Sequence, residues 1–307
     1  MLSKEELEKL YKAGEIVHKT LEKALDIVRP GARVLDICTE LENYIISQGA
    51  RPAFPVNIGI NHVAAHYTAR IEDDLVIPEK SVVKVDVGAH IDGYIVDAAI
   101  TLCFNPVYEP LVQAALEALK VVKEILKAGL SLGRIGSYIE KAIRGRGFKP
   151  IENLTGHLIK RYELHAGKSI PNVDNGDERK VLEGEIYAIE PFATDGKGSV
   201  IDTPQVTIYR LIATPKKALK KHRELILKIQ EVSQGLPFSP RWLANKVNLS
   251  KDELVKVLDE LARENVLYAY PVLVEEGKGM VSQFEDTFIV KNDGCEELAH
   301  TLDLFRR

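Results

Sequence analysis

The pattern of apolar and polar positions repeats weakly in the two halves of the chain. Residues 28–52 align without gaps to residues 126–150. The alignment superposes Gly31 on Gly129, Ile37 on Ile135, Glu42 on Glu140, Ile45 on Ile143, Gly49 on Gly147 and Pro52 on Pro150. In each copy a helix stops at a glycine, and a second helix follows with apolar residues at three- and four-residue spacing. Chance placement of glycines is the alternative, and we favour an internal duplication.

Runs of β-branched residues follow both copies and predict strands. The first half contains VVKVDVG and YIVDAAITL, and the second contains IYAIEPFAT and VSQFEDTFIV. Two helices followed by paired strands, twice over, predict an α+β fold with helices packed on the outer faces of a curved sheet.

A helical segment interrupts the second pair of strands. We expect residues 208–272 to form an inserted subdomain, and residues 1–207 with 273–307 to form the main domain. Within SPRWLANKVNLSKDELVKVLDELARENVLYAYPVL the pattern predicts a short helix, a turn, a longer helix and a strand, which resembles a winged helix. Ser250 and Glu253 predict a capping box for the longer helix. Its expected apolar face comprises Leu254, Val257, Leu258 and Leu261.

A winged helix raises the alternative of nucleic-acid binding. Positive charge precedes the longer helix, at Lys216, Lys217, Lys220, Lys221 and Arg223. The longer helix itself is acidic, at Asp252, Glu253, Asp259, Glu260 and Glu264, and these side chains would repel phosphates. We therefore favour a packing or substrate-shaping role for the insertion.

Composition narrows the class of protein. The 307 residues are 45% hydrophobic and carry a formal charge of −4, which gives no general attraction to nucleic acid or anionic lipid. Cys38, Cys103 and Cys295 are scattered, so neither a disulfide framework nor a thiolate zinc site is indicated. The charged, amphipathic N-terminus is not typical of a secretion signal. We expect a cytoplasmic protein that does not enter membranes.

Two aspartates in KVDVGAHIDGYIVDAA are the first candidates for chemistry. A two-residue turn at Ile91 and Asp92 would place Asp86 directly opposite Asp97, with both carboxylates on one face. Their immediate neighbours are apolar, and a pair of buried carboxylates requires a proton or a cation between them. A solvent-facing pair on an edge strand is the alternative. We favour a metal site.

The duplication adds two more acids and a histidine. It relates Asp86 to Glu190 and Asp97 to Glu285, so a pseudo-twofold axis would bring four carboxylates to one centre. Four carboxylates match two divalent cations roughly 3.5 to 4 Å apart. His157, which follows a glycine in NLTGHLIKRY, is the candidate neutral donor.

Two further histidines, His66 and His165, are related by the repeat with a shift of one residue. We expect them to approach the centre from opposite sides, where imidazoles can exchange protons with reacting groups or hydrogen-bond the substrate. Ordinary surface histidines are the alternative.

These segments resemble a known family over nearly the whole chain. AFPVNI, AAHYT, the aspartate hairpin, TGH with LHAGKSIPN, AIEPFAT and QFED stand in the order and spacing of type II methionine aminopeptidases. The absence of a long charged N-terminal extension resembles the archaeal form. The resemblance implies a pseudo-twofold pita-bread fold, removal of the initiator methionine from nascent polypeptides when the next residue is small, and two divalent ions drawn from Co, Mn, Fe and Zn.

The resemblance also implies residue roles. The metal ligands would be Asp86, Asp97, His157, Glu190 and Glu285. Asp97 would chelate one ion, Asp86 and Glu285 would bridge both, and Glu190 would also carry a proton. His66 and His165 would contact the substrate, His66 by stabilising the tetrahedral intermediate or assisting departure of the new amine, and Phe54 would wall the methionine pocket. Asp286 and Thr155 depart from the histidine and asparagine that the family commonly has there, and we expect them to affect efficiency or preference.

Two rival functions follow from the same fold. A prolidase-like dipeptidase usually has a sizeable N-terminal domain, for which this chain has no room. A catalytically inactive relative that binds RNA or the ribosome should have lost metal ligands, whereas all five are present. The expected partners are N-termini of nascent polypeptides, with a ribosome contact left open, and the expected state is a monomer.

Overall fold

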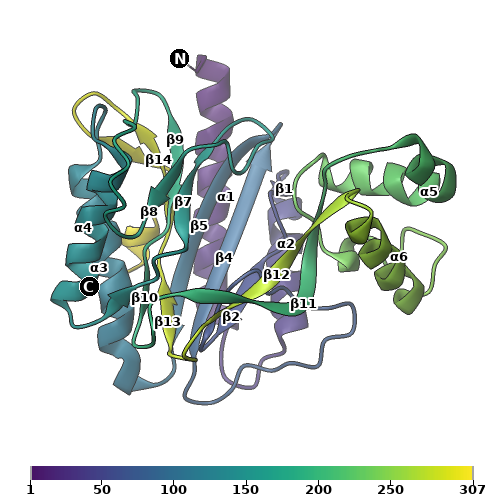
Figure 1. Cartoon of the computed structure of the whole chain (residues 1–307), viewed down its shortest axis with the longest axis horizontal. Helices are drawn as coiled ribbons and strands as arrows, with labels where there is room; N and C mark the ends of the chain where they lie inside the picture. The colour runs from purple at the N-terminus through teal and green to yellow at the C-terminus, as the bar shows by residue number, and fades with distance from the viewer. Residues whose placement is uncertain (1, 306–307) are drawn as a thin grey trace.

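The computed structural model describes residues 2–305 and has the predicted α+β architecture (Figure 1). The helices are α1 (Lys4–Ile27), α2 (Val34–Ser47), α3 (Glu109–Ile125), α4 (Leu132–Gly145), α5 (Lys216–Ser233) and α6 (Lys251–Arg263), with short 3-10 turns η1 (Pro106–Tyr108), η2 (Pro240–Trp242) and η3 (Thr301–Phe305). The longer strands are β4 (Val82–Ile91), β5 (Tyr94–Cys103), β11 (Val200–Leu211) and β12 (Leu267–Glu275). The shorter strands are β1 (Arg51–Pro52), β2 (Asn57–Ile60), β3 (Val63–Ala65), β6 (Lys149–Pro150), β7 (Thr155–Ile159), β8 (Ser169–Pro171), β9 (Ile186–Ile189), β10 (Phe192–Thr194), β13 (Val281–Gln283), β14 (Asp286–Val290) and β15 (Cys295–Glu297).

The glycines that recur in the sequence alignment share a backbone conformation. Gly31 and Gly129 have φ of 83° and 87°, and Gly49 and Gly147 have φ of 83° and 85°. Only glycine adopts this region without steric cost. Gly31 and Gly49 flank α2 in the first half, and Gly129 and Gly147 flank α4 in the second; each helix has 14 residues. The repeated glycines therefore have a conformational cause.

The two halves build similar antiparallel sheets that meet in the middle of the molecule. β4 lies between β2 and β5, and β9 lies between β7 and β14. The halves join where Ala99 and Glu285 exchange backbone hydrogen bonds of 3.3 and 3.0 Å. Helix α1 packs against β4 and β5, while α3 and α4 pack against the second-half strands, as Figure 1 shows. One hydrophobic core extends through both halves.

The second-half strands are shorter than the sequence pattern predicts. IYAIEPFAT was expected as one strand, but it is broken into β9 and β10 at Glu190 and Pro191. Proline cannot donate a backbone hydrogen bond, so it interrupts a strand pairing. VSQFEDTFIV is likewise divided between β13 and β14, at Phe284 and Glu285. Both acids therefore sit at strand breaks.

The inserted helices have a hydrophobic core of their own. Helices α5 and α6 lie at one end of the molecule, on the right in Figure 1, and are joined to the rest through β11 and β12. Their core includes Tyr209, Ile226 and Leu267. The capping box of Ser250 and Glu253 is present, which confirms that prediction. Leu254, Leu258 and Leu261 are buried and Val257 packs beside them, so the predicted apolar face is also confirmed.

The prediction of a short α-helix in the insertion is wrong. Its segment forms only the 3-10 turn η2. The reason is tertiary, because Arg241 in η2 donates two hydrogen bonds of 2.9 and 2.7 Å to the carboxylate of Glu42 in α2. Trp242 Nε1 donates to the same carboxylate at 2.9 Å. These bonds hold the segment against α2, and only 6% of the Glu42 side chain is exposed.

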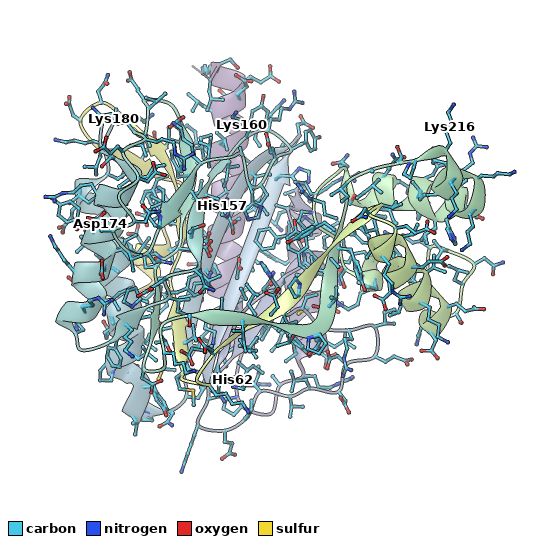
Figure 2. The ribbon with its side chains drawn as sticks, in the orientation of Figure 1. His62, His157, Lys160, Asp174, Lys180 and Lys216 are labelled. Carbon is cyan, nitrogen blue, oxygen red and sulfur yellow. The ribbon has the colours of Figure 1, made fainter. Side chains whose placement is uncertain are left out.

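Two of the five basic residues that precede the longer helix pair with acids. Lys221 pairs with Glu260 in α6 and Lys217 with Glu264 at the end of α6, so part of the charge of α5 is neutralised. Lys216 projects from the outer end of the insertion, far from His157 (Figure 2). Among the helices in residues 2–305, none is long and apolar enough to cross a membrane.

Candidate metal centre

Asp86 and Asp97 lie on adjacent strands, but their predicted register is wrong. The turn of the hairpin is Asp92–Gly93, with φ of 51° and 84°, and not Ile91–Asp92. An Asp-Gly pair is favoured where both turn residues need positive φ, so the sequence contained this signal. As a result Asp97 pairs with Gly88, and Asp86 pairs with Ala99. The two carboxylates are diagonal neighbours and still share one face of the sheet.

The structure brings together all five predicted donors. Their positions are Asp86 on β4, Asp97 on β5, His157 on β7, Glu190 directly after β9 and Glu285 directly before β14, and all five line one cavity of about 70 Å³. Donor atoms of Asp97, His157 and Glu285 lie within 4.8 Å of one another. His157 Nε2 is 3.5 Å from Asp97 Oδ2. Both halves of the chain therefore contribute carboxylates to one point.

Several of these donor atoms are buried without a hydrogen-bond partner. They are Asp86 Oδ1, Asp97 Oδ1, His157 Nδ1 and Glu285 Oε1. An unpaired buried polar atom costs free energy, and a carboxylate cluster costs more. Carboxylate oxygens with one imidazole are a suitable donor set for divalent cations. The residues present thus fit a metal centre.

The pKa shifts in this cluster have the same origin. Burial raises the pKa of Asp97 to about 8. Burial, together with the charge of Asp97, raises the pKa of Asp86 and of Glu285 well above their ordinary values. Burial lowers the pKa of His157 to about 4, which keeps the imidazole neutral and able to coordinate. A bound cation would offset the cost of burying these carboxylate charges.

Gln283 is a neighbour of the cluster that sequence reasoning missed. Its Nε2 donates to Glu190 Oε2 at 3.3 Å and to Glu285 Oε2 at 3.2 Å. It thereby links the two second-half acids and fixes their orientation. Its position two residues before Glu285, on the same side of an extended segment, was the available signal.

Phe54 forms one wall of the cavity and packs on the ligand hairpin. A Cβ atom on Gly88 would lie 2.3 Å from the Phe54 ring, so only glycine allows this approach. Gly88 is the residue opposite Asp97. The hairpin that carries the carboxylates therefore also seats Phe54.

His66 and His165 both line the cavity, as predicted. His66 has φ of 64°, and its Nδ1 donates to the Pro271 carbonyl at 3.1 Å. Burial lowers the pKa of His66, so the neutral ring presents Nε2 to the cavity as a hydrogen-bond acceptor. The His165 ring lies 4.2 Å from the His157 ring, centroid to centroid.

Other cavity residues were not named as site residues from the sequence. Asn57 and Leu164 lie within the segments AFPVNI and LHAGKSIPN, whereas Ile208, Pro237 and Tyr270 come from the insertion and its hairpin. Ile208 pairs with Tyr270 across β11 and β12. No periodicity indicates that this hairpin turns toward the cavity, because its path depends on tertiary packing. The insertion thus helps to shape the pocket.

The two departures from the family pattern lie outside the cavity lining. Asp286 accepts hydrogen bonds from the backbone N–H groups of Ala299 and Thr301, at 2.9 and 2.7 Å. It therefore anchors the segment before η3 to the strand that follows Glu285. Thr155 begins β7, opposite Pro171.

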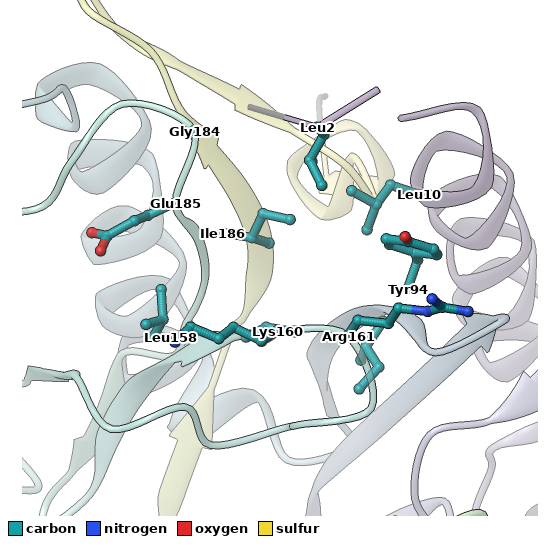
Figure 3. Close-up of a pocket in the computed structure, with 11 residues that line it drawn as sticks. Leu2, Leu10, Tyr94, Leu158, Lys160, Arg161, Gly184, Glu185 and Ile186 are labelled. Atoms are coloured by element: carbon teal, nitrogen blue, oxygen red, sulfur yellow. The ribbon is translucent and has the colours of Figure 1, made fainter. Parts of the chain in front are cut away.

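A second cavity, of about 230 Å³, lies on the other face of β7 (Figure 3). It is lined by apolar side chains that include Leu2, Leu10 and Leu158. Because side chains alternate along a strand, Leu158 faces this cavity while His157 faces the cluster of acids. None of the predicted site residues lines it.

Comparison with known sequences places the chain in a family. Residues 8–292 match metallopeptidase family M24. A methionine aminopeptidase from Saccharolobus solfataricus is 48% identical over 293 residues, which cover 95% of this chain and 97% of that protein. A methionine aminopeptidase from Pyrococcus horikoshii is 43% identical over 289 residues, 94% of this chain and 97% of that protein.

Solved structures share the fold. A thermophilic Arx1 superposes with a TM-score of 0.83 at 19% identity, covering 97% of this chain and 91% of that one. A methionine aminopeptidase from Thermotoga maritima gives 0.70 at 22% identity, with 97% and 98% covered. A prolidase from Pyrococcus furiosus gives 0.63 at 20% identity, and the match covers 97% of this chain but 64% of the prolidase.

The likeness confirms the predicted pita-bread fold, and α5 and α6 of this structure form the helical insertion. A metallopeptidase requires a divalent metal, in agreement with the buried donor cluster. The sequence match, the fold and the cluster lead to the same conclusion: the chain belongs to metallopeptidase family M24.

Proposed function

We propose that the chain is a methionyl aminopeptidase that removes the N-terminal methionine from nascent polypeptides whose second residue is small. The observation that carries this proposal is the convergence of five metal donors beside a small pocket walled by Phe54. The methionine aminopeptidases at 48% and 43% identity support the same substrate class. A cytoplasmic location and monomeric state are part of the proposal.

The proposed ligands are Asp86, Asp97, His157, Glu190 and Glu285, holding two divalent ions from the group Co, Mn, Fe and Zn. Bound there, the ions would polarise the scissile carbonyl and lower the pKa of water to about 7. Asp86, Asp97 and Glu285 would supply the carboxylate charge that holds the ions. All five donors are fixed on strands or at strand breaks, which keeps their geometry rigid.

Glu190 is the proposed proton carrier. It is only partly buried and faces the cavity, so it can reach a water there. Gln283 donates to one of its oxygens, Oε2, which leaves Oε1 available to accept a proton from that water as the water attacks the scissile carbonyl. Transfer of that proton to the departing amine completes hydrolysis of the peptide bond.

His66 and His165 are the proposed substrate contacts. Because His66 Nδ1 donates to Pro271, its Nε2 suits a peptide N–H of the substrate better than an oxyanion. His165 is open to solvent beside His157 and can donate to a substrate carbonyl. Phe54 would contact the methionine side chain.

The division of the chain into residues 1–207 with 273–307 and an inserted subdomain of residues 208–272 is also proposed. It is supported by the separate core of α5 and α6. We assign the insertion a substrate-shaping role, since Ile208 and Tyr270 line the cavity.

The test is release of free methionine from a Met-Ala-Ser peptide by metal-stripped protein, before and after addition of Co²⁺ or Mn²⁺. We expect release only with metal, and loss of release in Asp97→Ala. Folded protein that releases no methionine with any divalent metal would refute the proposal.

A further inference from the structure

The hairpin of β11 and β12 has two faces with different surroundings. Its pairing runs without a break from Ile208 opposite Tyr270 to Leu211 opposite Leu267. Side chains alternate between the faces. One face packs into the core of the insertion through Leu211 and Leu267. The other lines the metal-site cavity through Ile208 and Tyr270, so the next pair on that face, Arg210 and Tyr268, extends the cavity wall outward.

Aromatic rings on this face form a continuous path from the cavity to solvent. The rings of His66 and Tyr270 meet edge to face with centroids 5.3 Å apart. Tyr270 and Tyr268 make a second edge-to-face contact at 4.7 Å. Tyr268 is 48% exposed, although a large apolar ring gains by burial. Such a surface suits an extended peptide.

Arg210 stands beside this path without a partner. Its side chain is half-buried, and its Nε is buried with no hydrogen bond. Within residues 2–305, no carboxylate forms an ion pair with its guanidinium. Burial raises the pKa of Tyr270 and the Arg210 charge opposes that rise, which is consistent with a guanidinium close to the ring. A planar guanidinium is suited to bind a carboxylate through two hydrogen bonds.

We propose that Arg210, Tyr268 and Tyr270 form a subsite for the peptide that follows the scissile bond, and that Arg210 selects a carboxylate side chain there. Arg210 is two strand residues beyond Ile208, or about 6.6 Å, a distance that an extended peptide spans in two residues. Because Ile208 lines the metal-site cavity, where the scissile bond would lie, the acid that reaches Arg210 is the second or third residue after that bond. The inference rests on the proposed aminopeptidase function and names a class of its substrates.

The test uses amidated peptides, in which the only carboxylate is the one under study. The pairs are Met-Ala-Glu-Ser-amide against Met-Ala-Gln-Ser-amide, and Met-Ala-Ser-Glu-amide against Met-Ala-Ser-Gln-amide. The readout is the Glu/Gln ratio of kcat/KM at low salt. We expect a ratio of roughly five at one of the two positions, as for a partly exposed ion pair.

Variants assign the ratio to Arg210. Arg210→Met should reduce it to about one, Arg210→Lys should retain part of it, and Arg210→Glu should favour a peptide with Lys at that position. Arg223→Met removes an exposed arginine of the same subdomain and should keep the wild-type ratio. Because each ratio is internal to one protein, a loss of folded enzyme does not alter it.

A wild-type ratio near one at both positions would overturn the subsite, as would a ratio that persists in Arg210→Met and Arg210→Glu. If the wild type released methionine from none of the peptides, the proposed function would be rejected, and the subsite with it. The two failures are thus distinguishable.

Discussion

The two halves of the molecule reach the metal centre by different routes. The first half supplies Asp86 and Asp97 from one continuous hairpin of ten-residue strands. The second supplies Glu190 and Glu285 from breaks between short strands, with the whole insertion between them in sequence. The difference shows that a duplicated framework can keep its donor positions while the connection between them changes, provided the strands still pair.

The halves differ in a second respect at the positions of Glu42 and Glu140, which the repeat relates. Glu42 is buried against Arg241 of the insertion, with Arg241 8% exposed. Glu140 pairs with Arg144 on the same helix, and that arginine is 45% exposed. The same position therefore takes part in a buried ion pair in one half, the Glu42–Arg241 clasp, and in a surface ion pair in the other.

The largest expected effect tests whether both halves are needed for one centre. Asp97→Asn and Glu285→Gln should each lower metal-dependent methionine release by at least about a thousandfold, because each removes a charge that we propose holds the ions, worth several kcal/mol. Steady-state kinetics with matched metal concentrations would measure this. Asp26→Asn, an exposed change, should leave the rate unaltered. Near-normal turnover in either ligand variant would mean that one half suffices.

Loss of the buried Glu42–Arg241 ion pair should destabilise the protein much more than loss of the exposed Glu140–Arg144 pair. Glu42→Gln leaves the buried Arg241 guanidinium without a compensating charge, and should lower the free energy of unfolding by about 3 kcal/mol. Glu140→Gln removes a surface pair and should lower it by at most about 1 kcal/mol. Urea denaturation would compare the two. Equal losses would show that the insertion is not fastened through Glu42.

A smaller effect than the loss of the Glu42 carboxylate concerns the tight turn of the first-half hairpin. Buried His90 accepts a hydrogen bond from the Gly93 N–H through Nδ1, at 3.1 Å. Burial, and then the charge of Arg51, lowers the pKa of His90 to about 4, although nearby Asp92 opposes the shift. A histidine whose pKa is lowered by folding makes its full contribution to the stability of the folded state when the pH is above its ordinary pKa. This contribution is lost as the pH falls toward the pKa that the histidine has in the folded state.

Stability should therefore fall between about pH 6.5 and pH 4, by on the order of 2 kcal/mol from this group. His90→Gln retains an acceptor and does not titrate, so its unfolding free energy should fall less over the same range. Thermal or urea unfolding at a series of pH values would measure the difference. If the unfolding free energies of the variant and the wild type changed equally with pH, the assignment of this pH dependence to His90 would be refuted. The second half has no such turn, because β9 and β14 are not joined by one.

The sequence indicated the site better than the geometry around it. The duplication and the apolar surroundings of Asp86 and Asp97 predicted a carboxylate cluster, since both features can be recognised in the sequence without knowledge of the tertiary packing. The register was missed because the Asp92–Gly93 turn was not recognised. The clasp could not be predicted, since Glu42 and Arg241 lie 199 residues apart with no shared pattern. Ile208, Pro237 and Tyr270 entered the cavity through packing that no periodicity records.

The hairpin of β11 and β12 links the evolution of the insertion to the evolution of substrate choice. Leu211 and Leu267 on one face belong to the insertion's core, while Ile208 and Tyr270 on the other belong to the pocket. A lineage that replaced the insertion with another helical module would have to exchange this hairpin too, and would change its choice of peptides in the same event. Conversely, substitutions in the buried core of α5 and α6 would shift this hairpin and the pocket with it. Selection on the substrates that the enzyme accepts would therefore also act on that core.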